Sequence, residues 1–439
     1  MSSCSCRHAA ATIHGLLLLW PASCAFAQET PPAGARSEGI ETITVTARRR
    51  EELLQDVPAS VSAFSEADLE KRAVISPREL GQAVPNLNYE NVSGLGNSAK
   101  IYIRGVGQED FTPTRDMGVG VYLDGVYLAR LSSPTFDLFD VERFEVLRGP
   151  QGTLFGRNTV GGAINITSVK PKMEFESKLD LEVGNFSAWG VKGMINVPLG
   201  SSDKAAIRAS VYSRDADGWQ TNIEDGSKFA STDALGSRVA LRYAPSDSWE
   251  FNLVGDQLRK RQAPPVAHCV YGQPVEPAAQ PLIDALADLG FDLEQECRIS
   301  FESEPDEVSI DTLGNDDIDV HGLAATAEWT PQASGPLGEI SVKTIFSWRR
   351  QEWTLLFDEE MSAAPLLREE LVDNPNDEKQ YTAELQLTGK AVDDRLNYVI
   401  GLYWFSEDAF FEDNFRFFPG TDFDSGPLPV RTEAEAKSF

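Results

Sequence analysis

The stretch "VERFEVLRGPQGTLFGRNTVGGAINI", residues 141–166, sets glycines repeatedly between two apolar, strand-like runs. A phosphate-binding loop is the first alternative to test, because such loops are also rich in glycine. It requires G-x-x-x-x-G-K-[ST] leading into a helix. Here Gly156 is followed by Arg157 and Asn158, and the chain then enters the strand-like "GGAINITS". The glycines therefore serve the backbone, in turns with positive φ and where strands approach closely. The residues expected in this role are Gly105, Gly125, Gly149, Gly152, Gly156, Gly161 and Gly162.

The N-terminus is typical of a cleaved secretory signal. Arg7 precedes the apolar run "GLLLLW", and the small-residue triplet "AFA" follows at 25–27, so residues 1–27 are expected to be removed. A buried N-terminal helix and a lipoprotein site at Cys24 are the less favoured alternatives. No other apolar run approaches the roughly 18 residues that a transmembrane helix requires. The mature chain is then either exported and soluble or a closed β-barrel in a membrane.

Cysteine content and charge limit the classes of function. Cys269 and Cys297 remain after the signal, and in an oxidising compartment they are expected to form one disulfide, with two buried free thiols as the alternative. No CxxC pair or Cys/His cluster predicts a metal site. The net charge is −29, of which −3 falls in residues 41–170 and −26 in residues 171–439. A basic face for nucleic acid is therefore not expected.

Residues 49–171 are predicted to form a compact α+β domain. "SEAD" at 65–68 is a helix start of the capping-box kind, and "SPREL" at 76–80 predicts a second short helix. Asp124-Gly125 predicts a hairpin turn, because both turn positions favour positive φ. The preceding residues 28–48 begin with "QETPPAGARSEGI" and predict a flexible tether.

From residue 172 onward the sequence predicts antiparallel β-strands. Segments such as "ISVKTIFSW" alternate between two faces, which suits a transmembrane β-strand but also a soluble β-sandwich. Short turns such as "PLGSSD" and "APSDS" alternate with connections that are mostly long, which favours an outer-membrane barrel. The aromatic residues Trp219, Trp353 and Phe410 are then expected in the interfacial girdle rather than at a ligand.

Several segments, in order, resemble the hallmark segments of TonB-dependent outer-membrane receptors. They are "ITVTARRREE", "IRGVG", "VGVYLDGVYL", "FDLFDVERFEVLRGPQGTLFGRNTVGGAINI" and "ELQL". The resemblance implies an α+β plug domain at 49–171 inside an antiparallel transmembrane β-barrel, which has about 22 strands in full-length members. It also implies a monomer in the lipid and lipopolysaccharide of a Gram-negative outer membrane, which takes up a scarce large nutrient with energy from TonB and its ExbB/ExbD complex.

The resemblance also assigns roles to individual residues. Ile40, Glu41, Thr42, Ile43, Thr44, Val45, Thr46 and Ala47 match the TonB box, the segment offered as an added strand to the TonB C-terminal domain. This segment is rich in β-branched residues and lacks proline, which suits strand addition; an ordinary first strand of the plug is the alternative. Arg104 and Arg148 correspond to plug arginines that pair with barrel glutamates, for which Glu384 and Glu407 are the matches, with exposed surface charge as the alternative.

The length of the chain differs from that of the family. Residues 172–439 suffice for about ten strands, and "RTEAEAKSF" is charged where a terminal strand should be apolar. An N-terminal fragment or a truncated gene product is therefore expected. The expected ligand is a small molecule or metal chelate, foremost an iron–siderophore complex, with cobalamin or an oligosaccharide as alternatives. A passive porin would need neither plug nor TonB box, and no catalytic motif or cofactor site indicates an enzyme.

Overall fold

The computed structural model describes residues 43–438 with internal gaps. The gaps are 47, 51, 92–95, 109–114, 131–137, 201–202, 269–279, 289, 312–313, 333–337, 359–364, 371–375, 393–394, 420 and 422–423. Residues 43–439 cluster as one compact unit. The expected signal at 1–27 and the tether up to residue 42 lie outside the described residues, as does Cys269 of the expected disulfide.

The N-terminal part of this unit is the predicted α+β plug. Its central sheet has the order β3-β9-β10-β7-β8, in which only β10 and β7 are parallel. The strands are β3 (Val61–Ser65), β7 (Val119–Leu123), β8 (Val126–Leu128), β9 (Val141–Arg148) and β10 (Gly162–Ser168). A second, antiparallel sheet joins β4 (Leu87–Asn91), β5 (Ala99–Ile103) and β6 (Val106–Gln108). A separate two-stranded sheet pairs β1 (Thr44–Val45) with β2 (Glu52–Leu53).

Short helices connect the plug strands, and two of them begin where the sequence predicts. Helix α1 (Glu66–Lys71) starts in a capping box, because Ser65 and Asp68 exchange side-chain and backbone hydrogen bonds. Helix α2 (Pro77–Leu80) begins after Ser76 as well, but Ser76 makes no side-chain cap; Glu79 accepts instead from the Ile75 amide at 2.7 Å. The others are η1 (Leu54–Asp56) and α3 (Gly152–Phe155).

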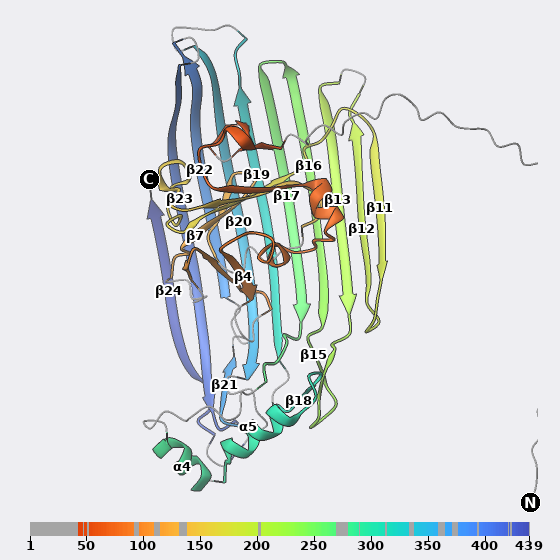
Figure 1. The fold of residues 1–439 in the computed structure, drawn as a ribbon, viewed down its shortest axis with the longest axis vertical. Coiled ribbons are helices and arrows are strands. Elements are labelled where there is room, and N and C mark those ends of the chain that lie inside the picture. The colour runs from red at the N-terminus through yellow and green to blue at the C-terminus, as the bar shows by residue number, and fades with distance from the viewer. Residues whose placement is uncertain are drawn as a thin grey trace, which may run out of the picture. The chain divides into compact units, whose positions relative to one another are not determined.

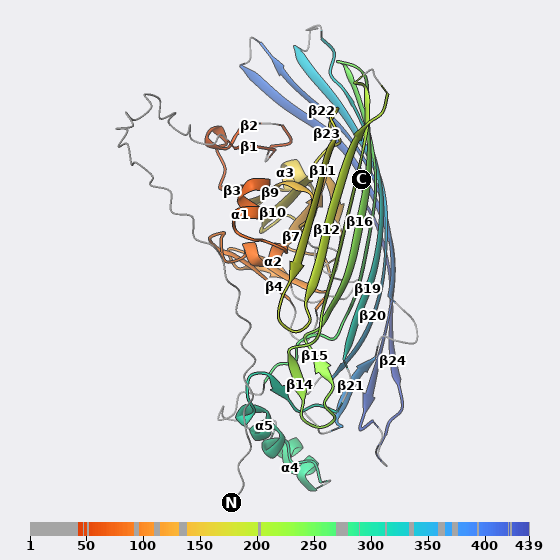
Figure 2. The same cartoon turned by 90° about the vertical axis from the view of Figure 1, so that its right-hand side faces the viewer.

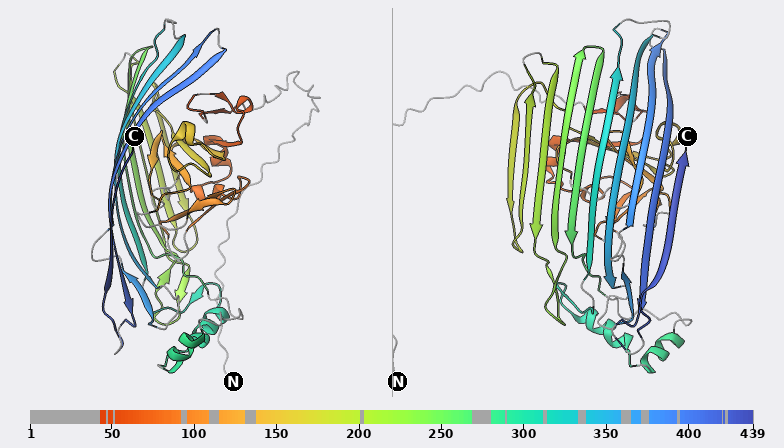
Figure 3. Two further views of the ribbon diagram at one scale, coloured as in Figure 1. Left: turned by 90° about the vertical axis from the view of Figure 1, so that its left-hand side faces the viewer. Right: turned by 180° about the vertical axis from the view of Figure 1, so that it is seen from behind.

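The rest of the chain builds one antiparallel sheet of 11 strands, ten long and one short. Each long strand pairs with the next long strand in sequence, as Figure 1 and Figure 3 show. The long strands are β11 (Glu176–Val183), β12 (Trp189–Pro198), β13 (Ala205–Ala216), β16 (Thr232–Ser246), β17 (Trp249–Gln262), β19 (Asn315–Trp329), β20 (Glu339–Asp358), β22 (Asn376–Ala391), β23 (Leu396–Phe417) and β24 (Leu428–Ser438). The short β21 (Leu367–Glu370) pairs with β20 and β23.

The two faces of the sheet differ because side chains alternate along each strand. The plug lies against the concave face (Figure 2), and its core of buried side chains includes Phe405 of β23. The other face carries exposed aliphatic and aromatic side chains, among them Leu181, Leu253 and Phe346. An apolar outer face and a polar inner face are the pattern of a transmembrane barrel wall, so the sandwich alternative is wrong.

Long and short connections lie at opposite ends of the sheet. The long ones contain β14 (Gln220–Asn222), β15 (Lys228–Phe229), α4 (Gln280–Asp288), α5 (Leu293–Glu302) and β18 (Glu307–Val308). Strand β14 pairs in parallel with β18, which joins two of these connections into one small sheet. The β1–β2 pair lies toward the other end, where the short turns are (Figure 2). None of the described helices is long and apolar enough to cross a membrane.

Candidate functional site

The described part of the expected TonB box, residues 43–46, is docked on the plug. Thr44 and Val45 pair with Leu53 and Glu52, and the Leu54 amide donates to the carbonyl of Ile43 at 2.9 Å. The side chain of Val45 is fully buried. The sequence predicts a flexible tether here, whereas the structure shows a short strand held by an apolar side chain and backbone bonds. Residues 40–42 and Ala47 lie outside the described residues.

A buried carboxylate on an interior strand of the plug sheet holds the end of this segment. Glu145 of β9 accepts from the Thr46 amide at 2.7 Å and from its hydroxyl at 3.1 Å. Asn165 of β10 donates to the same carboxylate at 2.9 Å, and Arg143 contacts it at 2.7 Å. Glu145 is completely buried, so its charge depends on these donors. No sequence motif indicates this role, because Glu145 lies 99 positions from Thr46.

The arginine that follows the box contacts the barrel wall. Arg49 lies 3.6 Å from Glu384 of β22, and its guanidinium also stacks over the rings of Phe155 and Tyr122. Its Nε donates to the carbonyl of Leu154 at 3.1 Å. Glu384 therefore faces a plug arginine, as the resemblance implies, but the arginine is Arg49.

The second predicted glutamate also meets a different arginine. Arg130, just after β8, contacts Glu407 of β23 at 2.5 Å, with side-chain exposures of 7% and 2%. Glu378 of β22 lies 3.9 Å from the same guanidinium. Burial alone lowers the pKa of Arg130, but the charges of Glu378 and Glu407 outweigh it and raise the pKa above its usual value. Arg130 is therefore a fixed cation between two carboxylates.

Arg104 and Arg148 lie elsewhere on the plug. Arg104 is exposed and adopts φ +54° in the turn between β5 and β6. Arg148 donates to the carbonyl of Pro85 at 3.3 Å. Neither forms an ion pair within the described part of the chain, so the pairing implied for them with Glu384 and Glu407 is not what the structure shows.

A single row of residues across the inner face of the sheet holds the β7–β8 hairpin. Each member lies directly opposite the next on the neighbouring strand. This polar row consists of Arg238 (β16), Asp256 (β17), Gly322 (β19), Arg349 (β20), Gln380 (β22) and Glu407 (β23). Because Gly322 has no side chain, Arg349 reaches across β19 to Asp256, at 3.0 Å.

The hairpin contacts the polar row at both of its ends. At its tip Asp124 forms an ion pair with Arg238 and accepts from the Ser168 amide at 2.8 Å. At its base Gln380 donates to the carbonyl of Tyr127 at 2.6 Å and accepts from the Ala129 amide at 3.2 Å. Burial raises the pKa of Asp124, but Arg238 and Ser168 together outweigh it, so the net pKa lies below its ordinary value.

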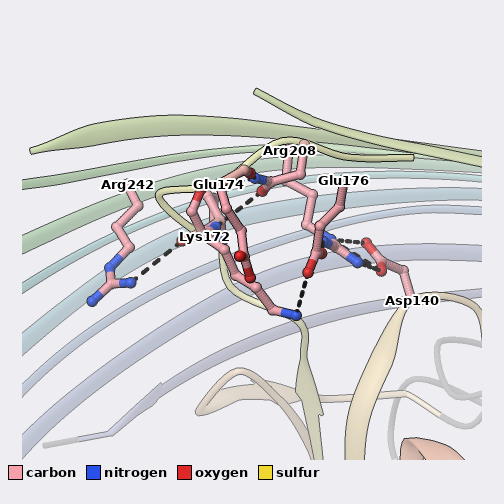
Figure 4. Close-up of polar contacts among 8 residues, drawn as sticks. Asp140, Lys172, Glu174, Glu176, Arg208 and Arg242 are labelled. Atoms are coloured by element: carbon pink, nitrogen blue, oxygen red, sulfur yellow. Dashed lines mark hydrogen bonds and ion pairs between the residues drawn. The ribbon is translucent and has the colours of Figure 1, made fainter. Parts of the chain in front are cut away.

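The segment between plug and sheet is clamped by a second cluster, drawn in Figure 4. Arg208 of β13 donates to Asp140 of the plug at 2.9 and 2.5 Å and to Glu176 of β11 at 3.1 Å. Arg208 and Asp140 are each 4% exposed. Asn196 of β12 donates to the carbonyls of Lys172 and Glu174 at 2.7 and 2.5 Å. An arginine fork on a buried carboxylate fixes both distance and direction.

A third contact joins the β4–β5 connection of the plug to the wall. Asp316 at the start of β19 is fully buried and accepts from the Asn97 amide at 2.7 Å. Trp353 of β20 donates to the same carboxylate at 2.6 Å. Trp353 is thus a buried lumen residue, and its expected place in the interfacial girdle is wrong, because its indole N–H needs an acceptor that lies inside.

The predicted glycines fall into three groups. Gly105, Gly125, Gly149, Gly156 and Gly162 have positive φ. Gly161 has an ordinary φ, but a Cβ there would lie 2.7 Å from the carbonyl oxygen of Val106. Gly152 has neither a positive φ nor any atom within 4 Å of a built Cβ. Among the described residues, no group of three or more His, Cys, Asp or Glu side chains is arranged to hold a metal ion.

Comparison with known proteins gives the same assignment for the plug and the sheet. A family model for the TonB-dependent receptor plug domain matches residues 53–163. The vitamin B12 transporter BtuB of Vibrio vulnificus (strain YJ016) is 27% identical over 250 residues, which cover 55% of this chain and 38% of that protein. The pesticin receptor of Yersinia pestis is 32% identical over 204 residues, which cover 45% of this chain and 29% of that protein.

The fold comparison extends over the sheet. The crystal structure of the ferric yersiniabactin uptake receptor FyuA from Yersinia pestis matches with a TM-score of 0.63 at 18% identity, covering 87% of this chain and 60% of that chain. The match with each of the two curated relatives spans less than half of the relative's length. A TonB-dependent receptor plug domain followed by a wall of antiparallel strands assigns the chain to the TonB-dependent receptors of the Gram-negative outer membrane.

Proposed function

We propose that the chain supplies the plug and adjoining wall of a TonB-energised transporter, with an iron–siderophore complex as its cargo. The pesticin receptor and the ferric yersiniabactin uptake receptor support an iron chelate. The similarity to a vitamin B12 transporter supports cobalamin as the second candidate. The observation that carries the proposal is the docked box segment, whose backbone is paired over only two residues.

A short strand pair is well suited to exchange. The pair β1–β2 aligns only Thr44 with Leu53 and Val45 with Glu52, so few hydrogen bonds are lost when the segment leaves. The TonB C-terminal domain would replace them by pairing with the same backbone, which is how strand addition gives affinity. Two further interactions hold the segment. They are the hydrogen bonding of Thr46 to Glu145 and the burial of the Val45 side chain.

The same geometry defines where a pulling force enters the plug. A pull on the box reaches Thr46 first and then Glu145, which lies on β9, between β3 and the central strand β10 of the plug sheet. The β7–β8 hairpin and the clamp at Asp140 hold the other side of the plug to the wall. Force is therefore applied across the plug sheet, between a weakly held N-terminal edge and a firmly held wall side.

The experiment is uptake of radiolabelled ferric siderophore by cells that lack their own receptor for it. Deletion of residues 40–47 from the chain should abolish uptake but leave binding of the labelled complex at the cell surface unchanged. A control deletion of equal length in the tether, at residues 30–37, should leave both unchanged. Uptake that persists without the box would contradict the energy coupling.

A passive porin and cobalamin as cargo are tested in the same cells. A porin would keep importing after the proton gradient is collapsed with an uncoupler, whereas a TonB-energised transporter stops. Competition by unlabelled cobalamin for surface binding would identify cobalamin as the cargo. Lack of competition, with saturable siderophore binding, would support the iron chelate.

A further inference from the structure

A cavity of about 980 Å³ lies between the plug and the inner face of strands β16, β17, β19, β20 and β22. Thr46 of the box segment and Arg49 line it on the plug side. At its other margin it reaches Asp247 and Ser248 in the short turn between β16 and β17. It therefore adjoins the segment that TonB is proposed to bind.

The lining of this cavity is rich in cationic residues, although the chain as a whole has a net charge of −29. Its cationic residues are Arg49, Arg50, Arg143, Lys170, Lys204, Arg238, Arg242 and Lys343. Its anionic residues are Asp124, Glu142, Asp203, Asp247, Glu250 and Glu328. The lining residues count eight cations and six anions, and Arg49, Arg50 and Arg143 pair with Glu384, Glu52 and Glu145 outside the lining.

Most of these cations are neutralised by a partner. Lys170 and Arg242 each lie 2.7 Å from Glu250, and Arg238 pairs with Asp124. Two lysines differ, because within the described residues neither Lys204 nor Lys343 forms an ion pair. Lys204 is exposed in the turn between β12 and β13, where water solvates its charge.

Lys343 is partly buried inside the cavity, in the middle of the wall. Its neighbours across the strands are Glu328 on β19 and Gln386 on β22. Glu328 does not contact Lys343, and it accepts from the Ser341 hydroxyl at 3.2 Å. The negative charges of Glu328 and Asp124 act favourably on the ammonium group of Lys343, whereas the positive charges of Lys170 and Arg49 oppose it. An ammonium group with three donors thus lines the cavity without an ion-pair contact within the described residues, and charges of both signs surround it.

We propose that Lys343 forms an anion-binding site in this cavity, for a carboxylate or phosphate group. The hydroxyls of Thr326 and Thr388, which line the same space, would supply further donors, whereas the amide of Gln386 already donates to Glu384 at 2.7 Å. An ammonium group that lacks an ion-pair contact can form a charge-assisted hydrogen bond with such an anion. This inference rests on the proposed function, in which the cargo passes this part of the lumen. A cargo that binds here carries negatively charged groups.

The test is calorimetric titration of the purified full chain in detergent micelles at low salt, with citrate and pyrophosphate as probes and sucrose as a neutral control. We expect K343Q to weaken citrate binding about tenfold, the loss of one charge-assisted hydrogen bond. K343R keeps the positive charge and should keep the affinity. Normal binding by K343R would show that a substitution at this position does not by itself disrupt folding. E328Q should tighten binding, because it removes the carboxylate opposite Lys343. The matched control K204Q should bind like the unmodified chain.

Equal citrate affinity in K343Q and the unmodified chain would overturn the proposal, as would the lack of saturable binding of either anion. Tighter binding of citrate supports a carboxylate group, and tighter binding of pyrophosphate supports a phosphate group. Removal of residues 40–47 should leave anion binding intact. Failure of the uptake experiment and failure of this one are therefore distinguishable.

Discussion

Arg130 of the plug contacts Glu407 of strand β23 at 2.5 Å, and this pair closes one end of the polar row along which the β7–β8 hairpin lies. The hairpin joins the wall at its tip and its base. The central plug strand β10 pairs with β7, so the contacts that anchor this hairpin to the wall also anchor the plug sheet. The strength of this anchor can be measured residue by residue.

Loss of Arg130 should cost more stability than loss of its partner. R130Q removes the guanidinium that lies between the buried Glu378 and Glu407, and breaking a buried pair in this way costs about 3 to 5 kcal/mol. E407Q leaves Arg130 with Glu378 and should cost less. Urea unfolding in detergent micelles gives both values, with K192Q, on an exposed pair, as the control. Equal losses for R130Q and K192Q would contradict the anchor.

Gly322 is the position in the polar row where a side chain does not fit. A Cβ there would lie 2.5 Å from an oxygen of Asp256 and 2.7 Å from a guanidinium nitrogen of Arg349. G322A should therefore break the contact between them and destabilise the protein by about 1 to 3 kcal/mol. Gly255 is the matched control, because the nearest atoms to its built Cβ are 4.0 Å away. The measurement compares the urea midpoint of G322A with that of G255A. Equal midpoints would show that a methyl group at position 322 is accommodated without loss of the contact between Asp256 and Arg349.

Glu145 should control how firmly the box segment is docked. In E145Q the buried charge that accepts from Thr46 and faces Arg143 is lost, so the segment should detach more often. A nitroxide on I43C, in a chain whose Cys269 and Cys297 are replaced by serine, reports this by electron paramagnetic resonance as a larger mobile fraction. E142Q is the control, since Glu142 contacts Arg143 from an exposed position. An unchanged spectrum in E145Q would show that Thr46 is not held by Glu145.

The tip of the hairpin should weaken at acid pH. The pKa of Asp124 lies below its ordinary value in the folded protein, so its contribution to stability is fully present above the pKa of the unfolded chain, about 4. That contribution is lost as the pH falls through the lower pKa of the folded state, where Asp124 takes up a proton. The difference in unfolding free energy between the unmodified chain and D124N should shrink from neutral pH to about pH 3. A constant difference would mean that Asp124 contributes without its charge.

The sequence predicts those parts of the fold that depend on neighbours along the chain. The capping box at Ser65 and the turn at Asp124-Gly125 are local, and both are present. The ten long strands follow from two-residue alternation and the spacing of turns. These features need no knowledge of distant partners.

The contacts between plug and wall could not be predicted in this way, because their partners are far apart in sequence. Glu384 and Glu407 face the plug. Which arginine reaches each of them depends on the register of the strands that follow residue 370 in the sequence. The same holds for Trp353, whose partner Asp316 lies on a neighbouring strand. The role of Glu145 at Thr46 is visible only once β9 is placed beside the box segment.

The central claim is that the backbone at residues 44–45 is the strand that TonB takes over from β2. The direct measurement is the affinity of the purified TonB C-terminal domain for the full chain in detergent, with V45P and V45I as a pair. V45P removes a backbone donor and should weaken binding about tenfold or more, whereas V45I, which keeps the β-branched side chain, should bind normally. E145Q should bind more tightly, because the segment leaves the plug more easily. Undiminished binding of TonB by V45P would contradict the account.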